Sequence, residues 1–94
     1  MLKPGEILLL RLIRANNGKL NFCTLDRAAW RNGWRDLDKR QVFDATYSLI
    51  DMGYVIAEGE NPGMPNYWIT DSGMKILQEF VENRLLRDDN RCVY

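Results

Sequence analysis

The chain has 94 residues, 46% of them hydrophobic, a length that supports one hydrophobic core. We therefore expect a single domain over residues 1–86, with a C-terminal tail over residues 87–94 that frays. Thirteen Lys and Arg residues balance thirteen Asp and Glu residues. No net positive charge draws the whole protein to a polyanion, so any nucleic-acid surface must come from local segregation of charge.

Residue types that carry most enzyme chemistry are scarce. The chain contains no histidine, and its two cysteines, Cys23 and Cys92, lie far apart, which excludes the usual zinc ligand sets and His-based catalysis. There is no Gly-rich phosphate loop and no convergent carboxylate pair. Cys23 could be activated at a helix start, but a small thiol buried in a strand is the preferred interpretation. We expect no catalytic residue, no metal and no cofactor.

Nothing in the sequence predicts a membrane segment. Residues 7–13 are apolar, but Arg11 interrupts this run, which is too short to cross a bilayer. No small-residue cleavage site follows it, as a signal peptide would require. Two cysteines without a pattern are typical of a reduced compartment, so we expect a cytoplasmic protein.

The first predicted helix begins at Pro4, extends to about Ala15 and stops at Asn16-Asn17-Gly18. Its apolar residues cover more of the circumference than one core-facing stripe needs. Two interpretations follow: the helix packs between two others, or part of its surface forms a homodimer contact. The last helix of the chain is the other candidate for such a dimer contact.

A short edge strand is expected over residues 19–22. Thr24 is then the predicted N-cap of a second helix, which Gly33 ends. Trp30 lies near the end of this helix, and an aromatic side chain of this size is predicted to belong to the core.

A third helix is predicted within residues 37–53, with Asp36 or Asp38 as its N-cap. Its apolar residues Val42, Ala45 and Leu49 recur at the spacing of one buried stripe, and a glycine follows as the stop.

Two β-rich runs, GYVIAE and NYWIT, flank a loop rich in Gly and Pro, which indicates a hairpin. Thr70 then caps a final helix, in which Met74, Leu77, Val81 and Leu85 form one apolar stripe. The predicted fold is α+β and mainly helical: helix, short strand, helix, helix, two-stranded hairpin, helix. This is the order of a winged helix-turn-helix.

The segment SLIDMGYV, followed by a hairpin and YWITDSGMKIL, resembles the MarR- and PadR-like winged-helix regulators. The resemblance spans roughly residues 5–82 and includes Leu49 four residues before Gly53, and Gly73 at the start of the last helix. It implies a DNA-binding domain whose third helix enters the major groove, with the hairpin as the wing. The long dimerisation helices of MarR proteins are absent.

Carried over, the resemblance implies that Lys39 and Arg40 neutralise phosphates and that Gln41 reaches a base edge. Arg27, Arg31 and Arg35 precede Lys39 at intervals of four, which could place a basic strip beside the third helix. The first hypothesis is therefore a small transcriptional regulator that binds double-stranded DNA. The plain alternative for the strip is a solvated face whose arginines pair with Asp26, Asp36 and Asp38.

A second hypothesis is a winged-helix module that binds another protein. Phe43 and Tyr47 lie on the exposed side of the predicted third helix and would serve as anchors. Residues 53–66 contain no Lys or Arg but do contain Glu58 and Glu60, so the wing suits a basic partner better than phosphate. The exposure of Phe43 discriminates between the hypotheses: burial against the second helix favours DNA, and exposure favours a protein partner.

Overall fold

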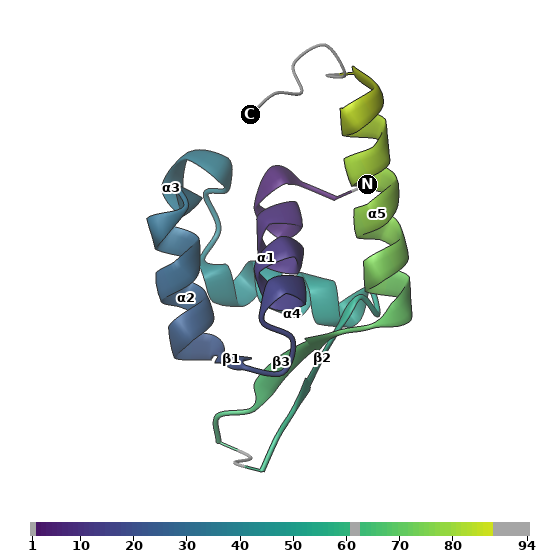
Figure 1. Ribbon diagram of the computed structural model, residues 1–94. Coiled ribbons are helices and arrows are strands. Elements are labelled where there is room, and N and C mark those ends of the chain that lie inside the picture. The colour runs from purple at the N-terminus through teal and green to yellow at the C-terminus, as the bar shows by residue number, and fades with distance from the viewer. Residues whose placement is uncertain (1, 61–62, 88–94) are drawn as a thin grey trace.

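The structure is a computed structural model that describes the backbone of residues 2–60 and 63–87, and the side chains up to residue 80. Its elements, in chain order, are α1 (Pro4–Ala15), β1 (Leu20–Asn21), α2 (Phe22–Arg31), α3 (Trp34–Leu37), α4 (Val42–Asp51), β2 (Val55–Glu58), β3 (Asn66–Ile69) and α5 (Asp71–Arg87) (Figure 1). The predicted class, α+β and mainly helical, is confirmed. The frayed tail predicted for residues 87–94 lies outside the described residues except for Arg87, where α5 ends.

The three strands form one antiparallel sheet in the order β1-β3-β2, so β1 is an edge strand as predicted. Leu20 is paired with Tyr67, and Val55 with Ile69. The hairpin therefore forms from the two β-rich runs that the sequence indicates. Its free edge is β2, which follows α4 in the chain.

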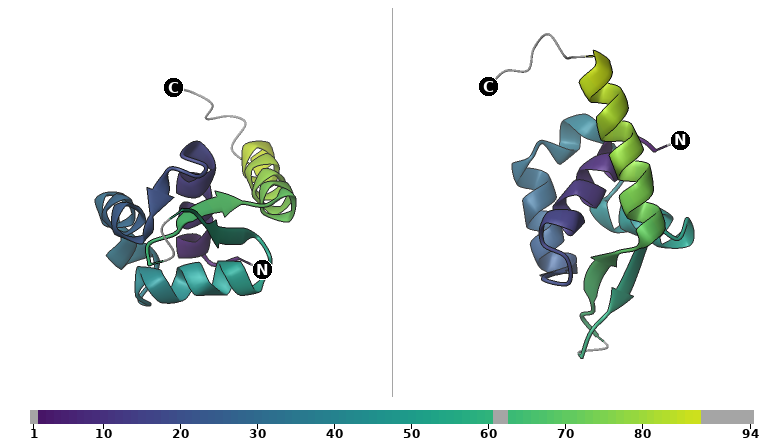
Figure 2. Two further views of the ribbon diagram at one scale, coloured as in Figure 1. Left: turned by 90° about the horizontal axis from the view of Figure 1, so that it is seen from below. Right: turned by 45° about the vertical axis from the view of Figure 1, so that its right-hand side comes forward.

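The core forms around α1, whose Leu9, Leu10 and Ile13 are fully buried. In the left view of Figure 2, α2 and α5 lie on opposite sides of α1, and α4 crosses beside it. The predicted stripe of α4 is confirmed, because Val42, Ala45 and Leu49 all face this core. Leu8 and Leu12 are half-buried, so α1 is largely covered by its neighbours while part of its apolar surface remains at the molecular surface.

The start of α2 differs from the prediction. Asn21, rather than Thr24, is the N-cap: its side-chain oxygen accepts the Thr24 backbone N–H at 3.0 Å, and the Thr24 hydroxyl accepts the Asn21 N–H at 2.9 Å. This reciprocal pair begins the helix at Phe22 and shortens the strand. Cys23 therefore lies exposed in the first turn of α2, and the prediction of a thiol buried in a strand is wrong.

The predicted third helix begins later than expected, and a separate helical turn precedes it. Gly33, with φ of +84°, ends α2 and is followed by the single turn α3; the chain is then extended at Asp38. The Asp38 carboxylate accepts the backbone N–H of Arg40 at 2.9 Å, a turn that competes with helix formation. As a result α4 begins only at Val42, with Gln41 at its N-cap, and the predicted cap at Asp36 or Asp38 is wrong.

The two tryptophans that flank Gly33 differ in burial, and the core residue is not the one that the sequence predicts. Trp34 is only 1% exposed and is the core residue, whereas Trp30 is 46% exposed. Because Gly33 turns the chain, Trp34 points inward from α3, where its Nε1–H donates to the Arg40 carbonyl oxygen at 2.8 Å. The prediction that Trp30 belongs to the core is wrong.

The last helix begins as predicted, since the Thr70 hydroxyl accepts the Gly73 N–H at 3.0 Å. Leu77 is buried, but Met74 is exposed, so the predicted stripe holds only in part; Val81 and Leu85 lie outside the described side chains. Gly73 lies directly against the Tyr54 backbone carbonyl oxygen, with no room for a Cβ atom.

We expect Gly73→Ala to lower the free energy of unfolding by about 2 kcal/mol, because the added methyl group would push α5 away from β2. Urea denaturation of the variant and of Ser72→Ala, at the exposed neighbouring position, measures this effect. Equal stability of the two variants would show that the helix start tolerates a side chain at residue 73.

Candidate functional site

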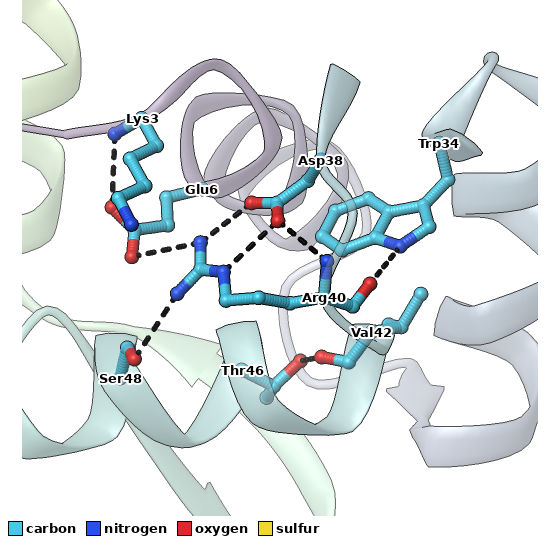
Figure 3. Close-up of polar contacts among 8 residues, drawn as sticks. All are labelled: Lys3, Glu6, Trp34, Asp38, Arg40, Val42, Thr46 and Ser48. Atoms are coloured by element: carbon cyan, nitrogen blue, oxygen red, sulfur yellow. Dashed lines mark hydrogen bonds and ion pairs between the residues drawn. The ribbon is translucent and has the colours of Figure 1, made fainter. Parts of the chain in front are cut away.

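Arg40, in the loop before α4, is the centre of a polar network (Figure 3). Its guanidinium group forms ion pairs with Asp38 and with Glu6 of α1, the latter at 3.2 Å, and lies 3.4 Å from the Ser48 hydroxyl of α4. Hydrogen bonds from Arg40 lower the pKa of Asp38 despite its burial, and these carboxylates raise the pKa of Arg40. The network therefore fastens α4 to the start of α1.

This network changes the role expected of Arg40. Its side chain is 26% exposed and its charge is compensated by two buried carboxylates, so it is not a free phosphate ligand. Gln41 is exposed but precedes α4 rather than lying along its surface. Lys39 is exposed in the same loop. The three polar residues predicted for the face of the third helix therefore all lie before the observed helix.

The predicted basic strip is exposed but is not continuous. Arg35 and Lys39 line an open hollow of about 480 Å³ with Trp30, whereas Arg27 and Arg31 do not line it. Arg35 lies over the Trp30 ring at 5.4 Å, a cation–π contact. The four basic residues are all exposed, which agrees with the alternative of a solvated face. Within the described ranges none of them forms an ion pair, so the predicted pairing with Asp26, Asp36 and Asp38 is wrong for these four; Asp38 pairs with Arg40.

An aromatic cluster projects from the other side of that hollow. Phe43 is 43% exposed and Tyr47 is 54% exposed, both on α4. The Phe43 ring is edge-on to Phe22 at 5.3 Å and to Tyr47 at 4.6 Å between ring centroids. Phe43 is thus held in place by its neighbours without being buried against α2. The rings contact one another in the edge-to-face geometry that aromatic pairs prefer.

The cluster forms one wall of a second hollow, of about 540 Å³, which we call the α4 groove. Four residues of α4 at helical spacing make this wall, and the β2–β3 hairpin makes the facing one. The lining residues are Phe43, Thr46, Tyr47 and Ile50 from α4, and Ala57, Gly63, Met64, Pro65 and Tyr67 from the hairpin region, with Phe22 at the end. The groove is mostly apolar, and it is adjacent to the hollow beside Trp30, because Phe22 and Phe43 line both.

Charge is strongly segregated along the chain. Residues 1–40 contain nine basic and four acidic side chains, whereas residues 41–74 contain none that are basic and five that are acidic: Asp44, Asp51, Glu58, Glu60 and Asp71. The zero net charge thus conceals a basic segment (α1 to α3) and an acidic segment (α4 and the hairpin). The acidic wing is predicted from the hairpin residues alone. The excess of acidic residues in fact extends over the whole of residues 41–74.

Comparison with known proteins adds no assignment: no protein-family model matches the chain, and no curated protein or solved structure matches it. In the described part of the chain, acidic and sulfur side chains do not gather into a group that could hold a metal ion. No helix among the described residues has the length and apolar character needed to cross a membrane. The assignment of function therefore depends on the surface around α4.

Proposed function

We propose that this chain is a winged-helix-like domain that recognises another polypeptide through the aromatic face of α4. Support for the fold comes from the element order and from a hairpin that joins two strands of a small sheet. The observation that carries the function is the exposure of Phe43 and Tyr47 on the helix that such a domain would otherwise present to DNA.

The chemistry of α4 favours a protein partner over a phosphate backbone. Its charged residues are Asp44 and Asp51, which repel phosphate, and the hairpin contributes only acidic charges. Exposed aromatic rings beside an apolar groove bury a large area at little cost in conformational entropy, so they make effective anchors. An acidic surround then selects a partner with basic residues.

DNA binding by a transcriptional regulator remains the second proposal, because one observation favours it. Arg27, Arg31, Arg35 and Lys39 are all exposed and carry charges that no described acidic side chain compensates. Several such charges together release counterions from DNA, which gives a steep dependence of affinity on salt. In this proposal the contacts come from α2, α3 and the following loop, with Gln41 near the groove of the duplex.

Quantitative cross-linked capture from cells that naturally contain the protein tests the first proposal. A partner polypeptide should be retained by the wild type, and at least about tenfold less by the double variant Phe43→Ala, Tyr47→Ala, since such anchors contribute about 2 kcal/mol or more. The matched control Arg27→Ala, Arg31→Ala, which removes exposed side chains from α2, should retain it.

DNA binding, the second proposal, is tested by fluorescence anisotropy with random-sequence duplex DNA across a range of salt concentrations. Micromolar, salt-dependent binding that the arginine double variant weakens and the aromatic double variant does not would replace the protein proposal with the DNA proposal.

A further inference from the structure

Two complementary half-surfaces lie side by side on one face of the molecule. The basic half-surface consists of Trp30, Arg35 and Lys39, which line the first hollow. Asp26 lines the same hollow, as do Asp38 and Arg40, which pair with each other, so the hollow keeps a net positive charge. The acidic half-surface is the α4 groove together with Asp44 and Asp51, which helical spacing places next to Tyr47. Phe22 and Phe43 line both hollows and so mark the boundary between the halves.

The basic half-surface has the chemistry that the groove requires of a ligand. Trp30 is a large exposed apolar side chain, and the Arg35 guanidinium lies against its ring, so an aromatic anchor carries its own positive charge. Lys39 adds a second exposed charge. An apolar groove with an acidic surround is complementary to such a group in polarity and in charge.

A two-fold rotation brings these halves together. Consider the line that runs from the basic to the acidic half-surface of one copy. If the two-fold axis lies in the interface and is perpendicular to this line, each basic half faces the acidic half of the other copy. An axis parallel to that line would instead oppose like charges, at a cost. Because each contact in such an isologous interface occurs twice, modest single contacts are doubled.

We propose that this face binds the same face of a second copy, forming a two-fold dimer in which Trp30 and Arg35 of each copy dock at the α4 groove of the other. The proposal rests on the proposed function, in that it names the polypeptide partner of α4. This interface differs from the two dimer contacts that the sequence suggests. One of those uses the extra apolar surface of the first helix, α1, and the other uses the last helix, α5.

Sedimentation velocity and light scattering over a range of concentration and salt test the dimer. The wild type should dimerise at low salt and dissociate as salt rises, because the half-surfaces attract by charge. The variant Trp30→Ala, Arg35→Ala lacks the docking group, and Phe43→Ala, Tyr47→Ala lacks the groove wall. Each should raise the dimer dissociation constant at least about tenfold. The changed side chains are all exposed, and circular dichroism checks that each variant is folded.

Mixing the two variants provides the decisive measurement. In a mixed dimer, one copy keeps an intact docking group and the other an intact groove, so one of the two contacts is complete. The mixture should therefore associate more tightly than either variant alone and more weakly than the wild type. The variant Arg27→Ala, Arg31→Ala, which changes α2 outside the hollow, should dimerise as the wild type does.

Three results would overturn the proposal. The first is a wild type that is monomeric at low salt, and the second is a dimer unaffected by both double variants. The third is loss of the dimer in a Leu8→Ala, Leu12→Ala variant that circular dichroism and urea denaturation show to be folded, which would move the seam to α1. A monomeric wild type whose captured partner is still lost in the aromatic variant would overturn self-association alone and leave the proposed function standing. Partner capture thus tests the α4 surface, whereas the measured mass tests self-association, so the two proposals can fail independently.

Discussion

Replacing Trp34 with alanine is expected to lower the free energy of unfolding by about 4 kcal/mol. Trp34 is the largest fully buried side chain among those described, and it lies where α3 meets the core. Its removal would leave a cavity and would also deprive the Arg40 carbonyl oxygen of its indole N–H donor. Urea denaturation followed by circular dichroism measures the loss.

Trp30→Ala is the matched control, because the same side chain is removed three residues before the glycine and four before Trp34. Its ring is nearly half exposed, so the expected loss is below about 1 kcal/mol. If Trp30→Ala were the more destabilising variant, the assignment of Trp34 to the core would be wrong.

Arg40→Met should lower the free energy of unfolding by about 2 kcal/mol at neutral pH. The change leaves Asp38 and Glu6 buried without their cation, while the methionine retains most of the aliphatic volume. This loss of stability is smaller than that for breaking a fully buried ion pair, because the Arg40 side chain is partly exposed and solvent screens its charge. Chemical denaturation at several pH values measures both the size of the loss and its pH dependence.

The pH dependence follows from the direction of one pKa shift. Arg40 lowers the pKa of Asp38 in the folded protein, so the contribution of this carboxylate is complete above its unfolded pKa, about 3.9, and is lost as pH falls through the folded value. The difference between wild type and Arg40→Met should therefore shrink below about pH 4. Arg35→Met removes an arginine that forms no ion pair with any described residue, so it should cost little at any pH. A loss for Arg40→Met that stays constant into acid would contradict a role for the ion pair.

Elements with a strong local pattern could be predicted from the sequence. Pro4 and the Asn-Asn-Gly stop define α1, the spacing of Val42, Ala45 and Leu49 defines the buried side of α4, and the Gly- and Pro-rich loop defines the hairpin. In each case neighbouring residues in the chain determine the outcome, which is why pattern and structure agree.

The errors arose where residues distant along the chain compete with local preference. Asp38 is a good N-cap residue, but here its carboxylate binds Arg40, which is itself held by Glu6 more than thirty residues earlier. Helical spacing alone also does not tell which of two tryptophans around Gly33 faces the core. For the candidate site, periodicity predicts that Phe43 and Tyr47 are exposed, which the structure confirms. The groove could not be predicted in this way, because its second wall comes from the hairpin.

The division of charge at Arg40 and Gln41 also bears on how the chain folds. Residues 1–40 and residues 41–74 carry opposite net charges of five units, so in the unfolded chain the first segment attracts the second before any native contact exists. Since α1 packs against both α4 and β3, this attraction draws together the segments that must meet to form the core. Salt screens this attraction, so we expect its contribution to the collapse of the chain to weaken as the salt concentration rises. We therefore expect the separation of charge that shapes the surface of the folded protein to favour early encounters between its first and second segments as well.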